Sequence, residues 1–113
     1  MFLGKFLLGI LLITGVVFFP AAGWADNNIF VITIKDHQFS PAELTVPAHQ
    51  KIKLIIENQD ITPEEFESYD LNREKVVSGK AKITLYIGPL KPGTYKYFGE
   101  FHQKTAQGVI IVQ

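Results

Sequence analysis

Apolar and polar residues alternate in short runs along most of the chain after residue 28, as expected for β-strands with one face in a core. Segments rich in Gly, Pro, Asn and Asp separate these runs about every ten residues, a spacing typical of a β-sandwich. The predicted strands are Ile29–Lys35, Glu43–Val46, Lys51–Glu57, Glu64–Ser68, Ala81–Ile87, Thr94–Phe98 and Val109–Val112. No helical segment of adequate length lies between them, so a parallel βαβ arrangement is not predicted.

The pattern allows two interpretations for each of two further segments. Asp36–Pro41 contains one aromatic residue, Phe39, and is either a turn or an edge segment of a sheet. Tyr69–Val77 is either a helical turn or an irregular excursion. The sequence therefore predicts an all-β domain of seven to eight strands.

The N-terminus has the three parts of a secretory signal peptide. Lys5 supplies the positive charge, Phe6–Phe19 is an uninterrupted apolar run, and Gly23 and Ala25 are small residues at a cleavage site. The alternative is an uncleaved membrane anchor, but the run is shorter than the ~20 residues that a membrane-spanning helix needs. We therefore predict a signal peptide at residues 1–25, a mature domain at residues 26–113, and export to the periplasm.

The charge balance and the cysteine content limit the functions that this chain can perform. Without residues 1–25 the chain keeps ten of its eleven basic residues and all eleven acidic ones, a net charge near −1. This balance gives no support for nucleic-acid binding. The chain contains no cysteine, which removes thiolate chemistry and disulfides. We expect a monomer or a weak dimer that depends on its core or on a bound metal for stability.

Acidic residues gather in the middle of the chain, where seven of the eleven lie between Glu57 and Glu74. This run is either a solvated acidic edge or a site for a cation, which would relieve the repulsion between the carboxylates. Side chains alternate along a strand, so Glu64 is predicted to point inward with Phe66. Glu65 and Glu67 would then form an outward acidic pair, a possible second and more exposed site.

The segment Gly93–Gly108 is the second candidate for chemistry. It is predicted to form a strand that leads into a loop carrying Glu100 and His102, before the chain returns in its last strand. Rigid strands fix both ends of such a loop, which makes it a suitable place for functional side chains.

Several motifs carry a family resemblance. Phe39–Ala48 has the pattern F-x-P-x-x-L-T-V-P-A, and Pro92–Phe98 reads PGTYKYF. With the order of the strands, these motifs resemble plastocyanin-type proteins and imply a cupredoxin-like Greek-key β-sandwich. More narrowly, residues 62–77 (TPEEFES-x-DLNREKVV) and 87–108 (IGPLKPGTYKYFGEFH-x-x-TA-x-G) resemble small periplasmic cupredoxin-like proteins associated with bacterial high-affinity iron permeases.

The resemblance also shows what is missing from a blue-copper site. The position of the first histidine ligand is Glu64, that of the cysteine is Gly99, and no methionine occurs near Thr105. The second histidine is retained as His102, and the resemblance places His37 beside it. A blue-copper centre needs a cysteine thiolate, so the implied site has nitrogen and oxygen ligands that suit copper(II), iron, manganese or zinc.

The resulting hypothesis is a periplasmic metal-binding protein, not an enzyme, that holds iron or copper and supports iron uptake. Its predicted partner is a membrane iron permease or another periplasmic iron-uptake component. The predicted ligands are His37, Glu64, Glu65, Glu67, Glu100 and His102. Two alternatives remain: a ferroxidase-like redox partner, and a metal-free interaction domain whose acidic edge docks a basic partner.

Overall fold

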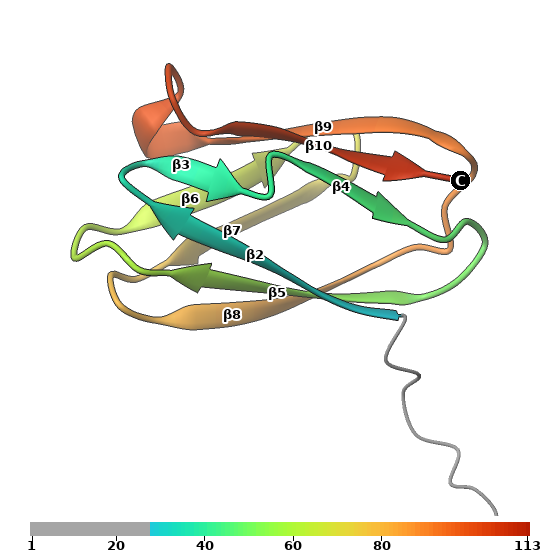
Figure 1. Cartoon of the computed structure of the whole chain (residues 1–113), viewed down its shortest axis with the longest axis horizontal. Coiled ribbons are helices and arrows are strands. Elements are labelled where there is room, and N and C mark those ends of the chain that lie inside the picture. The colour runs from blue at the N-terminus through green and yellow to red at the C-terminus, as the bar shows by residue number, and fades with distance from the viewer. Residues whose placement is uncertain (1–27) are drawn as a thin grey trace, which may run out of the picture.

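The computed structural model describes residues 28–113, which form a two-layer β-sandwich (Figure 1). The predicted signal peptide lies outside these residues. The nine strands of the described part are β2 (Ile29–Lys35), β3 (Gln38–Ser40), β4 (Glu43–Val46), β5 (Ile52–Asn58), β6 (Glu64–Ser68), β7 (Arg73–Val77), β8 (Lys82–Ile87), β9 (Gly93–Gly99) and β10 (Gln107–Val112). A short 3₁₀ turn, η4 (Glu100–His102), follows β9. Within residues 28–113, no helix has the length and apolar character needed to cross a membrane.

The strands divide into a five-stranded sheet, β4-β10-β9-β6-β7, and a four-stranded sheet, β3-β2-β5-β8. Two pairs are parallel, β2 with β5 and β4 with β10, and the other pairs are antiparallel. Strand β6 pairs with β9 so that Phe66 lies opposite Gly99. This pairing brings the start of β6 next to η4, although more than thirty residues separate them in the sequence. The all-β prediction is confirmed.

Side-chain alternation builds the core between the two sheets. In β5, Ile52, Leu54 and Ile56 are buried, while the residues between them lie on the outer face. The largest buried group is aromatic: the Phe66 and Tyr97 rings stack with their centroids 4.9 Å apart, and Phe39 meets the Tyr97 ring edge-on at 4.9 Å. Such pairs contribute about 0.5–1.5 kcal/mol each beyond the burial of their surface. This cluster gives β6 and β9 a rigid base near η4.

The structure resolves both open segments. Gln38–Ser40 forms a short edge strand, β3, paired with β2. Arg73–Val77 forms β7 instead of a helical turn, because the chain reverses after Tyr69 and pairs with β6 from Ser68 opposite Arg73 to Glu64 opposite Val77. These two strands raise the count to nine, compared with the seven to eight predicted. Neither has a long alternating pattern of its own, so pairing with a neighbour stabilises each of them.

Arg73 links the edges of the two sheets. Its Nε and Nη2 atoms donate to the carbonyl oxygen of Tyr86 on β8, at 3.2 and 3.0 Å. Its Nη1 atom donates to the carbonyls of Leu71 and Asn72, at 3.3 and 3.0 Å. The guanidinium therefore ties β7, an edge strand of one sheet, to β8, an edge strand of the other.

Candidate metal centre

Glu64 lies at the centre of the site. It begins β6, and its side chain points inward as predicted, so the residue is only 1% exposed. Oε1 accepts hydrogen bonds from the backbone N–H groups of Glu65 and Phe101, at 2.9 and 2.8 Å. Oε2 lies 2.7 Å from Nδ1 of His102. Both carboxylate oxygens are therefore paired, as a buried charge requires.

These contacts also fix the orientation of His102. When the Glu64 carboxylate is ionised it only accepts hydrogen bonds, and in that pairing Nδ1 of His102 is the donor. The nitrogen that remains free to accept a hydrogen bond or an ion is Nε2. Because Glu64 also holds the N–H of Phe101, it anchors η4 at two points, the backbone of Phe101 and the side chain of His102.

His37 lies directly against His102, as the resemblance implied. The two imidazole rings stack with centroids 3.6 Å apart and planes 11° from parallel. The nitrogen lone pairs of an imidazole lie in its ring plane. In two stacked rings they point along parallel planes and cannot converge on one ion. In this arrangement, therefore, the two histidines are neighbours and not a chelating pair.

Asp60 holds His37 in place. Its carboxylate accepts hydrogen bonds from the backbone N–H groups of Asp36 and His37, at 2.8 and 3.0 Å. Its Oδ2 atom also lies 3.5 Å from Nδ1 of His37. The hydrogen bond from the His37 backbone lowers the pKa of Asp60 below its usual value. Sequence reasoning missed this role, which depends on Asp36 and His37 both adopting positive φ angles, 53° and 58°.

Gly99 stands where the family has its cysteine ligand, and its surroundings test whether a blue-copper site fits. A Cβ atom at this position would lie 2.6 Å from Cδ of Glu64 and 2.6 Å from Cβ of Ala106. The Glu64 carboxylate fills the space that a cysteine side chain would need. Since the chain also contains no cysteine, this site is not a blue-copper centre.

A second group of candidate ligands lies on the other side of β6. One carboxylate oxygen from each of Glu65, Glu67 and Glu100 lies within 4.8 Å of the other two. We call these three half-buried residues the outer triad. The backbone of Phe101, which is bonded to Glu64, immediately follows Glu100. The Glu64 carboxylate therefore helps to position Glu100, one member of the outer triad.

The outer triad is electrostatically crowded, and Glu74 of β7 adds a fourth carboxylate opposite Glu67. Loss of solvation raises the pKa of Glu65, and the carboxylates of Glu74, Glu67 and Glu100 raise it further. The pKa of Glu67 is raised for the same reasons, with Glu74 and Glu100 as its charged neighbours. A bound cation would relieve this repulsion.

Asn58, the last residue of β5, ties the loops of this end together. Its buried Nδ2 atom donates to the carbonyls of Thr62, Val77 and Ser78, at 2.8, 3.2 and 3.3 Å. Its Oδ1 atom accepts from the N–H of Asp60, at 3.0 Å. Asn58 therefore positions Asp60, which in turn positions His37.

Comparison with known proteins identifies the family and the fold. The model of the cupredoxin-like domain matches residues 7–112, which is nearly the whole chain. The chain belongs to this cupredoxin-like family. An uncharacterized protein of Rickettsia prowazekii (strain Madrid E) is 59% identical over 88 residues, covering 77% of this chain and 70% of that protein.

Solved structures share the fold at low sequence identity. Amicyanin from Paracoccus versutus matches with a TM-score of 0.61 and 19% identity, over 81% of this chain and 86% of amicyanin. Auracyanin A, a blue copper protein from Chloroflexus aurantiacus, matches with a TM-score of 0.64 and 16% identity, over 75% of this chain and 98% of auracyanin. At these identities the likeness establishes the cupredoxin fold, and the ligands must be argued from this chain's own residues.

Proposed function

We propose that this protein is an exported carrier that holds an iron or copper ion through oxygen and nitrogen ligands and supplies it to an iron-uptake system. The ion is cargo, and the protein is not an enzyme. The outer triad is the observation that carries this proposal, because three carboxylates meet there within 4.8 Å on rigid elements. Carboxylate oxygens suit iron and copper(II), and an electrostatically strained cluster gains stability when a cation enters.

His37, Glu64 and His102, which we call the inner group, have a different role in this proposal. Glu64 already uses both oxygens in hydrogen bonds, so an ion there would have to displace one of them. Nε2 of His102 and of His37 remain available, but the stacked rings do not direct them to one point. The inner group therefore acts mainly by fixing η4 and Glu100, and direct ligation by His37, Glu64 or His102 is the second arrangement to be tested.

The cellular setting rests on the sequence. The N-terminal pattern of a signal peptide supports export to the periplasm. The two long motifs at residues 62–77 and 87–108 resemble proteins that accompany bacterial iron permeases. A carrier in this setting needs reversible binding, which a half-buried carboxylate site provides more readily than a buried thiolate site.

Thermal unfolding of the mature domain in the presence of copper(II), or of iron(II) under anaerobic conditions, tests the proposal. Binding at one hundred times Kd stabilises the folded state by about 2.7 kcal/mol. The double variant Glu65→Gln/Glu67→Gln is expected to lose most of this gain. The control Glu43→Gln/Glu57→Gln removes the same amount of charge outside the outer triad and should keep the stabilisation by the metal.

Three outcomes are informative. Loss of the metal effect in the outer variant alone supports the proposed site. Loss only in the double variant Glu64→Gln/His102→Gln moves the ion to the inner group. If neither ion raises the melting temperature of the wild-type domain, the carrier proposal is wrong and the metal-free interaction domain becomes the better description.

A further inference from the structure

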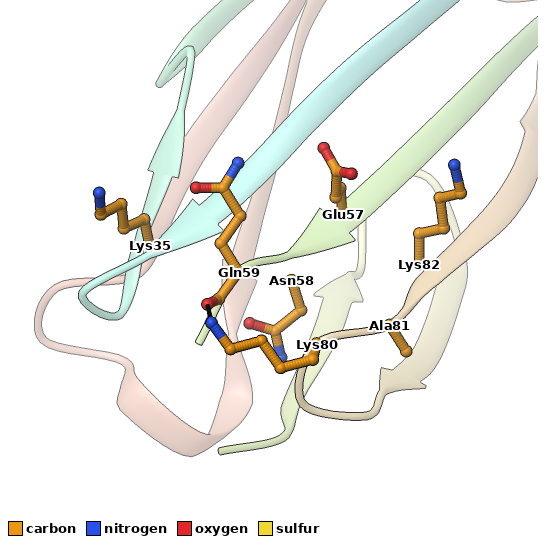
Figure 2. A pocket seen from close by; sticks show the side chains of 7 residues that line it. All are labelled: Lys35, Glu57, Asn58, Gln59, Lys80, Ala81 and Lys82. Atoms are coloured by element: carbon orange, nitrogen blue, oxygen red, sulfur yellow. Dashed lines mark hydrogen bonds between the residues drawn. The ribbon is translucent and has the colours of Figure 1, made fainter. Parts of the chain in front are cut away.

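A basic hollow lies on the outer face of the four-stranded sheet, where β2 and β5 end and β8 begins. Its lining residues are Lys35, Glu57, Asn58, Gln59, Lys80, Ala81 and Lys82, and its volume is about 510 Å³ (Figure 2). Three of the seven are lysines and one is acidic. The outer triad lies on β6 and η4, at the other sheet, so the sandwich carries clustered positive and negative charge on opposite layers.

The lysines of the basic hollow have acidic neighbours but form no close ion pair with them: Glu57 lies opposite Lys82 on the adjacent strand, and Lys80 acts electrostatically on the Asp60 carboxylate. In residues 28–113, no ion pair within 4.0 Å joins Lys35, Lys80 or Lys82 to a carboxylate. The ammonium group of Lys80 donates instead to the carbonyl oxygen of Gln59, at 2.7 Å. Figure 2 shows this bond, with Lys35 at one side of the hollow and Lys82 at the other. The positive charge is therefore available to a partner.

The floor of the basic hollow is rigid. The N–H of Asn58 donates to the carbonyl of Ala81, and the N–H of Lys80 donates to the carbonyl of Asp60, both at 2.8 Å. Gly79 approaches the carbonyl of Ile61 so closely that a side chain at this position would collide with it. These contacts hold residues 58–61 against residues 79–81. A partner would therefore bind a preformed surface and lose little conformational entropy in ordering it.

The spacing of the charges indicates what kind of anion fits. Lys35 on β2 and Lys82 on β8 flank β5, so their backbones are two strand spacings apart, roughly 10 Å. Glu57 lies between them on β5 and would repel a single anion placed at the centre. An extended peptide in the polyproline II conformation advances about 3.1 Å per residue with three residues per turn, so carboxylates three residues apart lie on the same side, about 9 Å from each other, and each can reach one lysine.

We propose that the basic hollow docks an extended acidic segment of a protein partner, with its carboxylates on Lys35 and Lys82. This inference rests on the proposed carrier function and gives the chemistry of the partner: an Asp- or Glu-rich stretch that binds away from the cargo. Docking on the four-stranded sheet leaves the outer triad uncovered, so the ion can be passed on while the carrier is held.

The test uses a fluorescently labelled peptide with four glutamates at every third position, titrated with the mature domain at low salt. The variant Lys35→Gln/Lys82→Gln is expected to weaken binding at least tenfold, and added salt should weaken it further. The control Lys91→Gln/Lys104→Gln removes two exposed lysines elsewhere and should change the Kd by less than about twofold. In backbone amide NMR spectra, the peptide should shift residues of the hollow.

Other results overturn the proposal. These are no measurable binding of the peptide, equal weakening by the two lysine variants, or amide shifts outside the hollow. Binding to vesicles containing phosphatidylglycerol but not to the peptide would assign the face to a membrane instead. Metal-induced stabilisation should be the same in both lysine variants, so a failure of docking is distinguishable from a failure of the carrier function.

Discussion

Replacing Glu64 tests the centre of the site most directly. In Glu64→Ala the backbone N–H groups of Glu65 and Phe101 lose their acceptor, and Nδ1 of His102 loses its carboxylate. A hydrogen bond to a charged group contributes about 1.5–3 kcal/mol. The removal of one partner from a buried network typically costs about 3–5 kcal/mol, and we expect a loss in this range. For a domain of this size that lowers the melting temperature by roughly 15 °C or more.

The conservative variant Glu64→Gln separates charge from shape. Its carbonyl oxygen can keep both backbone hydrogen bonds of Oε1, while its amide faces His102, whose Nδ1 can accept after a change of tautomer. We expect a smaller loss of stability, about 1–2 kcal/mol. His102→Ala removes one of the three contacts. A double-mutant cycle between Glu64→Ala and His102→Ala should therefore give a coupling energy of about 1–2 kcal/mol.

Urea unfolding followed by circular dichroism measures these free energies, with the slope m used to check that the unfolded state is unchanged. A loss below about 1 kcal/mol for Glu64→Ala would show that the buried carboxylate does not hold η4. A coupling energy indistinguishable from zero would show that Glu64 and His102 act independently, against the 2.7 Å contact.

Three further results are expected. Gly99→Ala should destabilise the domain by about 1–3 kcal/mol because its Cβ meets Glu64, and it should cost less in a Glu64→Ala background. Asn58→Ala should cost about 2–3 kcal/mol by urea unfolding, since a buried amide holds three carbonyls. Asp60 has a lowered folded pKa, so it stabilises the fold above its unfolded value of 3.8 and loses that effect as the pH falls through the folded pKa. The stability difference between wild type and Asp60→Asn should therefore shrink as the pH falls below about 4.

Alternation of apolar residues was sufficient to predict most strands and the inward direction of Glu64. Each of these features depends on the sequence of one segment only. In β6, for example, the apolar Phe66 marks the face that points into the core, and Glu64 lies on the same face.

Features that depend on two distant segments were not predictable in this way. β7 is a strand because β6 lies beside it, and its own sequence, REKVV, leaves the choice open. The role of Asp60 depends on two residues with positive φ, Asp36 and His37, more than twenty positions earlier. The basic hollow combines the ends of three strands, and its lysines are ordinary surface residues until the sheet places them around Glu57.

The contact between Gly99 and Glu64 also constrains how such a protein can evolve. A mutation that introduced cysteine at position 99 would meet the Glu64 carboxylate at 2.6 Å and destabilise the fold before it could bind copper. A mutation of Glu64 alone would leave the N–H of Phe101 and the imidazole of His102 without their acceptor, and would gain no sulfur ligand. Each single step towards a blue-copper site passes through a less stable protein. The two positions are therefore coupled, and packing itself makes the acquisition of sulfur-based copper chemistry difficult.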